Sequence, residues 1–208
     1  QHPESYIILP GQTHGTYSYP DLIVAMERSH QNKNWHATQE ALHQERTFML
    51  PLRQYVDFLK LLRSGNTVYD GRGKQLQRNK VNKILEDITQ VRNPWRSEWL
   101  DAQFSKQGRQ WYITYHNIKS DGTLEKTTEP LEQCIMKDGY VDLLGSANNQ
   151  GLPTKKARKR DFYYYKPSDD NNSVARFLAD DSGAGLSCGN VPRGAGSALG
   201  VRAARAKN

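Results

Sequence analysis

The sequence predicts an α+β fold, with two to three helices segregated from a mixed or antiparallel sheet. Two amphipathic helical patterns occupy residues 52–62 and 81–91 in the first half of the chain. Runs rich in β-branched and aromatic residues precede them and dominate after residue 110. Helices grouped in this way between two sets of strands favour α+β over a regular βαβ arrangement.

The chain is long enough, at 208 residues and 23.8 kDa, for one full-sized domain spanning residues 1–208. Hydrophobic residues make up 36% and the mean hydropathy is −0.84, so the 11 Tyr and 4 Trp are expected to supply much of the burial. No apolar run has the length of a membrane span or the form of a secretory leader, so we expect a soluble chain without membrane insertion.

The N-terminal part predicts two strands, at residues 6–9 and 22–26, each bordered by turn-forming residues. A helix is expected at residues 35–44, with an apolar face of Ala37, Ala41 and Leu42. Residues 47–50 are expected to be extended. Pro51 then opens the second helix, because a first-turn amide has no intrahelical partner to lose.

That second helix has apolar residues at spacings of three and four and ends at Gly65: Leu52, Tyr55, Val56, Leu59 and Leu62. The turn at residues 68–73 has the glycines of a phosphate loop but lacks its flanking motif. The third helix is expected to run to Asn93-Pro94 on the apolar positions Val81, Ile84, Leu85, Ile88 and Val91. An aromatic group at helical spacing follows and is expected in the core: Trp95, Trp99, Leu100 and Phe104.

The second half predicts strands and long loops. Residues 111–115 and 124–128 are expected to pair across a turn at 120–122. Shorter strands are predicted at 140–143 and 162–165, separated by a polar, basic loop at 145–160.

The segment 172–201 has a period of two. An inward set of small and medium apolar residues predicts up to three short strands: Ala175, Phe177, Ala179, Ala184, Leu186, Cys188, Leu199, Val201 and Ala203. The intervening residues, expected to be exposed, mix Arg, Leu, Asp, Gly and Ser without a common chemistry. Composition is also unusual: Lys, Glu, Gln, Met and Trp are 44 of the 208 residues, yet none lies in this window, where about six would be expected. A partly disordered Gly/Ser/Ala-rich tail is the alternative explanation.

This segment resembles the variable region of proteins diversified by retroelements, of the archaeal and archaeal-virus type. The matching positions are Ser173, Val174, Ala175, Phe177, Ala179, Ala184, Leu186, Cys188, Pro192, Leu199, Gly200 and Val201. In that family an error-prone reverse transcriptase randomises template adenines, mostly in Asn codons, which cannot thereby become Lys, Glu, Gln, Met or Trp. The resemblance implies a C-type lectin fold, with 172–201 as the variable ligand-binding region, and a cytoplasmic, virion or surface location stays open.

The resemblance implies a non-enzymatic display protein that binds a macromolecule, expected to be a protein, and that needs no cofactor. The expected ligand-binding residues are Arg176, Leu178, Asp180, Asp181, Ser182, Gly183, Gly185, Ser187, Gly189, Asn190, Val191, Arg193, Gly194, Ala195, Gly196, Ser197 and Ala198.

Two other functions remain open. The net charge of +7 and pI near 9.4 permit nucleic-acid binding through the basic segment Lys155, Lys156, Arg158, Lys159 and Arg160, for which a solvated loop is the simpler explanation. An oxidase resembling formylglycine-generating enzymes would need Cys134 to meet Cys188, although Cys188 is expected to be buried. The histidines have no metal-ligand spacing, and Glu129-Pro130 continues as Leu131, without the usual calcium-dependent lectin motif.

Overall fold

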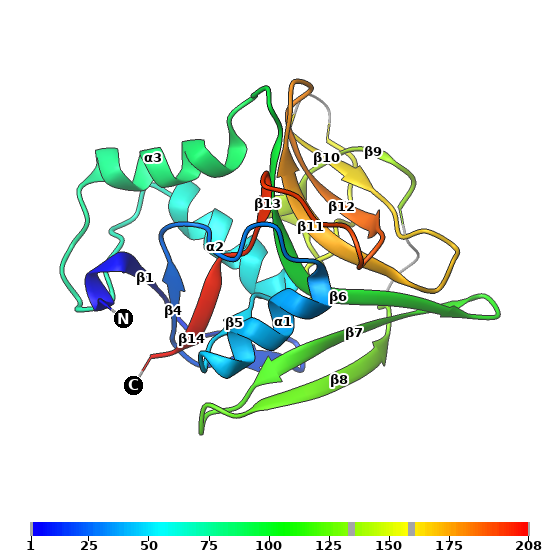
Figure 1. The fold of residues 1–208 in the computed structure, drawn as a ribbon, viewed down its shortest axis with the longest axis horizontal. Helices are drawn as coiled ribbons and strands as arrows, with labels where there is room; N and C mark the ends of the chain where they lie inside the picture. The colour runs from blue at the N-terminus through cyan, green and yellow to red at the C-terminus, as the bar shows by residue number, and fades with distance from the viewer. Residues whose placement is uncertain (1, 133–135, 158–160, 208) are drawn as a thin grey trace.

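A computed structural model describes residues 2–132, 136–157 and 161–207 of the chain. Within these residues it contains a four-stranded, a two-stranded and an eight-stranded sheet, with few helices packed against them (Figure 1). The α+β prediction is therefore confirmed. The helices are η1 (Pro3–Ser5), α1 (Trp35–Gln44), α2 (Leu52–Arg63), α3 (Arg78–Thr89) and α4 (Leu143–Ser146).

The four-stranded sheet joins the two ends of the chain in the order β1-β4-β14-β5. Its strands are β1 (Tyr6–Leu9), β4 (Leu22–Ala25), β5 (Phe48–Met49) and β14 (Ala203–Ala206). β14 pairs antiparallel with both β4 and β5, so the N and C termini lie near each other (Figure 1). A separate hairpin, β2 (Gln12–His14) with β3 (Tyr17–Tyr19), occupies the connection from β1 to β4.

The eight-stranded sheet has the order β8-β7-β6-β11-β12-β10-β9, with β13 paired to β6. Its strands are β6 (Arg96–Gln107), β7 (Gln110–Ile118), β8 (Leu124–Pro130), β9 (Gly139–Val141), β10 (Phe162–Tyr165), β11 (Ser173–Ala179), β12 (Ala184–Asn190) and β13 (Leu199–Gly200). Most neighbours are antiparallel, while β10–β12 and β6–β13 are parallel. The sheet is thus mixed, as expected.

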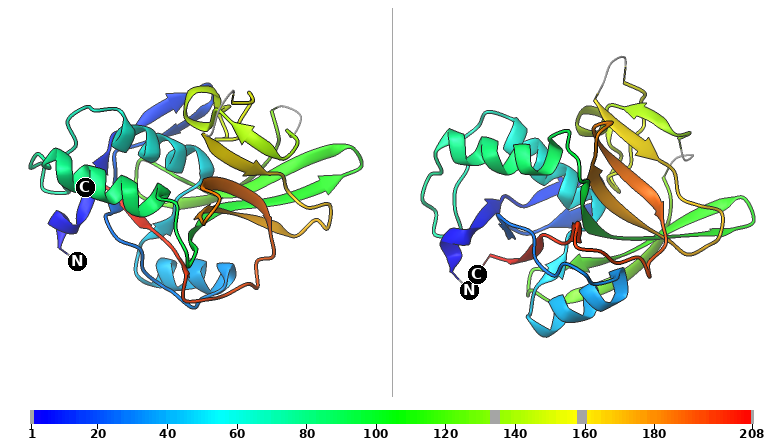
Figure 2. Two further views of the ribbon diagram at one scale, coloured as in Figure 1. Left: turned by 90° about the horizontal axis from the view of Figure 1, so that it is seen from above. Right: turned by 45° about the horizontal axis from the view of Figure 1, so that its top comes forward.

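The main core lies between α2 and the sheets. α2 is buried all round from Leu52 to Leu59, including its polar residues Arg53, Gln54 and Asp57, and its buried Tyr55 lies against Phe177 of β11. Figure 2 shows α3 alongside α2, whereas α1 lies apart from that pair. A second cluster of buried residues connects α1 to the C-terminal strands: Trp35, Leu42, Met49, Trp99, Val174, Leu199, Val201 and Ala203.

The local predictions are largely confirmed in the first half. α1 has the expected bounds, but Ala37 and Ala41 are only partly buried, and Thr38 and Gln39 share its buried face with Leu42. α2 ends before Gly65, whose φ of 80° is readily adopted by glycine, and Pro51 lies one position earlier than expected, at the N-cap.

Three local predictions are wrong. α3 ends at Thr89, so Val91 lies beyond the helix and is 61% exposed. The aromatic group after it belongs to β6, a strand of 12 residues, rather than to a helical pattern. Trp99, Leu100 and Phe104 are buried there as expected, but Trp95 precedes the strand and is 41% exposed. The segment at 140–143 is divided, because β9 ends at Val141 and Leu143 begins α4.

Candidate ligand-binding surface

Both ends of the segment 172–201 pair with the same strand, β6. On one side β11 runs antiparallel to it, with Arg176 opposite Trp99 and Ala179 opposite Arg96. On the other side β13 runs parallel to it, with Leu199 beside Ser97. These pairings use backbone groups, so the segment is attached to the scaffold by contacts that do not depend on most of its side chains.

The inward face of β11 and β12 is buried as predicted. Phe177, Leu186 and Cys188 are each at most 1% exposed. The Phe177 ring lies with its centroid 5.4 Å from Tyr55 and 5.5 Å from Phe162. A register shift between Val174 and Arg176 interrupts the alternation, so Val174 is buried in the second cluster while Ala175 enters the main core.

The opposite face of these strands is not the exposed face that the alternation predicted. Leu178, Gly185 and Ser187 are all buried. A Cβ at Gly185 would lie 2.3 Å from the carbonyl oxygen of Tyr163 on the neighbouring strand β10. Gly185 is therefore a packing position with no room for a side chain.

Arg176, on β11, and Trp95, just before β6, lie against each other beside Leu178. The Arg176 guanidinium carbon lies 5.2 Å from the centroid of the Trp95 ring, which is a cation–π contact. Burial lowers the pKa of Arg176, and the nearby Asp180 carboxylate opposes that shift. A hollow of about 340 Å³ opens beside the pair, lined by Arg92, Asn93, Trp95, Arg176, Leu178, Asp180 and Asp181.

The turn between β11 and β12 is closed by local hydrogen bonds. Asp180 Oδ1 accepts from the Ser182 amide at 2.9 Å and from Ser182 Oγ at 2.6 Å. The Asp180 amide donates to the Gly183 carbonyl, and Arg92 donates its amide to the Asp180 carbonyl, each at 2.9 Å. Asp181 and Ser182 are exposed at the tip, where a ligand can reach them.

The loop of residues 191–198 is held by its backbone. Its carbonyls accept from amides of the preceding half of the chain: Pro192 from Trp35 at 2.9 Å, Gly196 from Asn32 at 3.2 Å and Ala198 from Ser97 at 2.9 Å. The exposed side chains alternate along it: Val191, Arg193, Ala195 and Ser197. Among the described residues none of these four side chains has a hydrogen bond or an ion pair.

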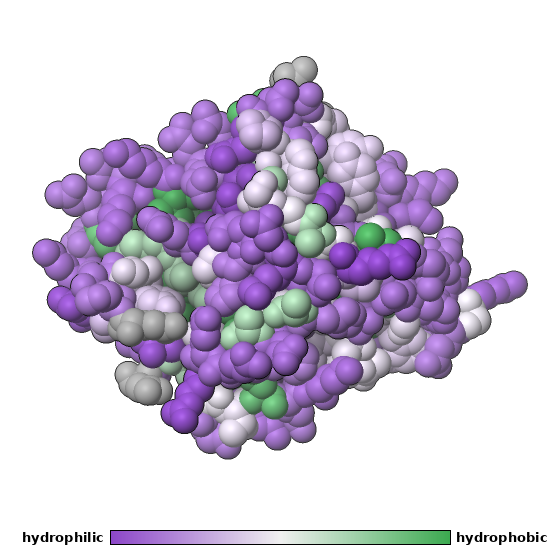
Figure 3. Space-filling view, in the orientation of Figure 1, coloured by the Kyte–Doolittle hydropathy of each residue, from purple (hydrophilic) through white to green (hydrophobic). Residues whose placement is uncertain are grey.

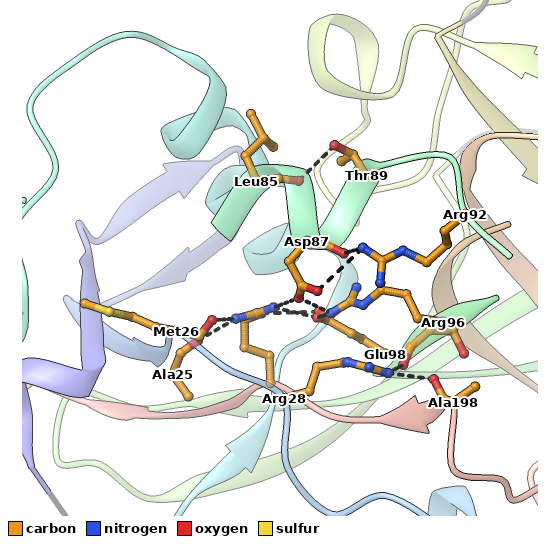
Figure 4. Close-up of polar contacts among 12 residues, drawn as sticks. Ala25, Met26, Arg28, Leu85, Asp87, Thr89, Arg92, Arg96, Glu98 and Ala198 are labelled. Atoms are coloured by element: carbon orange, nitrogen blue, oxygen red, sulfur yellow. Dashed lines mark hydrogen bonds and ion pairs between the residues drawn. The ribbon is translucent and has the colours of Figure 1, made fainter. Parts of the chain in front are cut away.

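An arginine outside the segment fixes the end of this loop. Arg28 Nη1 donates to the carbonyl of Ala198 at 2.6 Å and to that of Ser97 at 3.1 Å (Figure 4). The guanidinium therefore connects the last residue of the loop to the start of β6, again through main-chain oxygens.

A buried ion cluster lies directly beneath this junction. Glu98 is fully buried and accepts from Arg96 at 2.5 Å (Figure 4). It also accepts from Arg202 at 2.7 Å and from Tyr55 Oη at 2.7 Å. Arg202 also donates to the Ala25 carbonyl at 3.0 Å and to that of Met26. Burial alone would raise the pKa of Glu98, but Arg202 and Arg96 outweigh it and lower that pKa to about 2.

The 17 expected ligand-binding residues thus divide by exposure. Seven are exposed: Asp181, Ser182, Gly189, Val191, Arg193, Ala195 and Ser197. Seven are half-buried: Arg176, Asp180, Gly183, Asn190, Gly194, Gly196 and Ala198. Leu178, Gly185 and Ser187 are buried. Sequence reasoning missed Arg92, Asn93 and Trp95 at this surface, and the one available signal was a tryptophan directly after the helix-ending Asn-Pro.

The other candidate groups contribute little to a site. The Cys188 thiol is buried, and burial raises its pKa, which disfavours the reactive thiolate. Cys134, Arg158, Lys159 and Arg160 lie outside the described residues, while Lys155 and Lys156 are exposed. The described part of the chain contains no group of three or more metal-ligating side chains. None of its helices is both long and apolar enough to cross a membrane.

Comparisons with known proteins yield no match: no family model, no curated protein and no solved structure is similar to this chain.

Proposed function

We propose that this protein is a non-enzymatic display protein, whose residues 172–201 form a hypervariable surface that binds macromolecular ligands, expected to be proteins. The diversification would come from retroelement-directed adenine mutagenesis, and the fold would be a C-type lectin-like variant of the α+β architecture. The observation that carries the proposal is the loop 191–198, whose carbonyls accept from Asn32, Trp35 and Ser97, while its exposed side chains make no hydrogen bond or ion pair with the described part of the chain.

Three further features support the proposal. The inward residues of the period-two pattern are buried, and Phe177 packs against the ring of Phe162, as the resemblance implies. Exposed side chains on a rigid frame limit the ordering cost of binding. The face drawn in Figure 3 is mostly hydrophilic, with apolar surface confined to small patches, so that face offers no large fixed apolar patch for one particular ligand.

The hollow beside Trp95 combines residues outside the segment 172–201, which would stay constant, with residues inside it, which would vary. Trp95 and Arg92 lie outside the segment 172–201, and Arg176, Asp180 and Asp181 lie inside it. A partly exposed tryptophan is a frequent energetic anchor of protein interfaces. In this proposal Trp95 supplies affinity for every variant, while the loop supplies specificity.

The test is the DNA that encodes the protein. We expect a near-copy of the stretch encoding residues 172–201, differing at adenines and close to a reverse transcriptase gene. Sequencing the locus in independent isolates should show substitutions concentrated at the codons for Val191, Arg193, Ala195 and Ser197. An unchanging segment without any template copy would contradict the proposal.

A further inference from the structure

A hollow of about 600 Å³ lies between the C-terminal end of α1 and the hairpin of β7 and β8, and we name it the basic hollow. Three arginine or lysine residues line it from three parts of the chain: Arg46 after α1, Lys126 on β8 and Arg205 on β14. His43 and His116 also line it. Among the residues that the structure describes, no carboxylate lines it, so its formal charge is positive.

None of the three cations lies in an ion pair with another described residue. Carboxylates on the neighbouring elements already have partners: Glu45 accepts from His30 at 3.0 Å, and Glu125 pairs with Lys119 at 3.1 Å. Arg205 stacks its guanidinium carbon 5.4 Å from the Tyr6 ring centroid, and its Nε is buried without a hydrogen-bond partner in the described structure. Arg46, Lys126 and Arg205 therefore have no carboxylate within ion-pair distance in the described structure.

Arg46 occupies a backbone position that normally favours glycine. Its φ is 56°, directly after the helix cap of α1. The Thr47 amide donates to the Leu42 carbonyl and the Arg46 amide to the His43 carbonyl, which together form a Schellman motif with Arg46 at the left-handed residue. A side chain at such a position costs stability, and strained residues of this kind occur often at functional sites.

His116 provides a fourth polar group on the same wall. Its Nδ1 lies 3.1 Å from Asp101 Oδ2, and Asp101 is itself buried and accepts from Gln39 at 2.7 Å. The hydrogen bond to Asp101 is the main cause that raises the pKa of His116, while burial and the nearby Lys126 oppose it. The His43 ring packs edge-on at 5.4 Å, and burial, followed by His116, lowers the pKa of His43.

We propose that the basic hollow binds a phosphate-bearing small molecule, with Arg46, Lys126 and Arg205 contacting the phosphate oxygens. Arginine and lysine are the side chains that suit phosphate, and a hollow of this volume accommodates a ligand up to about the size of a nucleotide. The C-terminal carbonyls of α1 contribute a partial negative charge, but three full positive charges outweigh it. The site uses no residue of 172–201, so it is independent of the proposed display function.

Calorimetric titration of the full chain with inorganic pyrophosphate and with ATP tests this. We expect saturable binding of both probes, weakened about tenfold or more by Lys126→Gln and by Arg46→Gly. Lys83→Gln removes an exposed cation on α3 and is the matched control, for which we expect unchanged affinity. Equal affinity for both probes would indicate a free inorganic anion as the ligand, and a preference for ATP would indicate a nucleotide.

Arg46→Gly separates binding from folding. Glycine adopts the left-handed conformation without strain, so this variant should melt at a temperature equal to or about 2 °C above that of the parent while binding pyrophosphate more weakly. Two results would overturn the proposal: no saturable binding of either probe at millimolar concentration, or an equal loss in Lys83→Gln and Lys126→Gln.

Discussion

The hairpin of β11 and β12 and the loop 191–198 have the same unusual composition, but the structure treats them differently. In the hairpin both faces are largely covered, with Phe177 and Leu186 on one side and Leu178 and Gly185 on the other. In the loop, alternate side chains from Val191 to Ser197 are exposed, and the backbone carries the attachments. Composition alone therefore does not identify which positions can vary, because tolerance depends on whether a second layer covers the outer face.

The largest expected effect is at the core of the hairpin. Phe177→Ala should lower the free energy of unfolding by about 3–5 kcal/mol, because it removes a fully buried ring packed on Tyr55 and Phe162. Urea unfolding followed by circular dichroism measures this. A loss below about 1 kcal/mol would mean that the hairpin is not the packed half of the segment.

The second-largest loss of stability is expected from changing Glu98 in the buried ion cluster, and this loss should depend on pH. The Glu98 pKa of about 2 lies below its ordinary value of 4.5, so the ionised carboxylate stabilises the fold above pH 4.5 and loses that contribution as the pH falls toward 2. Glu98→Gln removes the buried carboxylate that Arg96 and Arg202 share and leaves them only the half-exposed Asp87, at 2.9 Å and 3.8 Å, so it should cost about 3–5 kcal/mol at pH 7.

Thermal melts of the parent and of Glu98→Gln between pH 7 and pH 2 test whether the charge of Glu98 is the cause. The parent should lose about 3 kcal/mol more than Glu98→Gln across the acid range. Glu86→Gln, an exposed position on α3, is the control and should follow the parent at every pH. Parallel curves for the parent and Glu98→Gln would contradict the role of this carboxylate.

Two glycines allow a direct comparison of the β11–β12 hairpin with the loop 191–198. Gly185→Ala places a Cβ 2.3 Å from the Tyr163 carbonyl oxygen and should destabilise by about 1–3 kcal/mol. Gly196→Ala in the loop finds no atom within 4 Å of its Cβ and should be neutral within about 0.5 kcal/mol. Thermal melts of the two variants measure the contrast, and equal losses would show that the loop is packed as tightly as the hairpin.

The smallest effect per substituted site is expected from changing several loop residues at once. Replacing Val191, Arg193, Ala195 and Ser197 together by Tyr, Asp, Asn and Tyr should shift stability by no more than about 0.5 kcal/mol per site. The same melts and the circular dichroism spectrum check this. Loss of cooperative unfolding in this variant would remove the structural basis for a variable loop.

Sequence reasoning succeeded where one physical requirement dominated. The three- and four-residue spacing of apolar residues in α2 predicted both the helix and its end before Gly65, although the polar Arg53, Gln54 and Asp57 are buried as well. The inward residues of 172–201 were also predicted, because Phe177, Leu186 and Cys188 face one core.

It failed where tertiary contacts replace the local pattern. β6 is buried on both faces at its start, and its buried Arg96, Glu98 and Asp101 interrupt any apolar alternation, so neither a strand nor an ion cluster could be predicted there. Leu178 lines the same hollow as Trp95 and Arg176, and Gly185 lies against a carbonyl from β10, which are tertiary neighbours that no local spacing encodes.

The pairing of both ends of the segment with β6 also bears on the order of folding. Val174 pairs with Gln103 and Leu199 with Ser97, so these contacts close chain loops of about 70 to 100 residues, whereas β6, β7 and β8 pair with neighbours close in sequence. Because pairings between residues far apart in the sequence cost more loop-closure entropy than local hairpins, we expect residues 172–201 to dock onto β6 late in folding. We therefore expect side-chain changes in the loop 191–198 to alter the unfolding rate more than the folding rate.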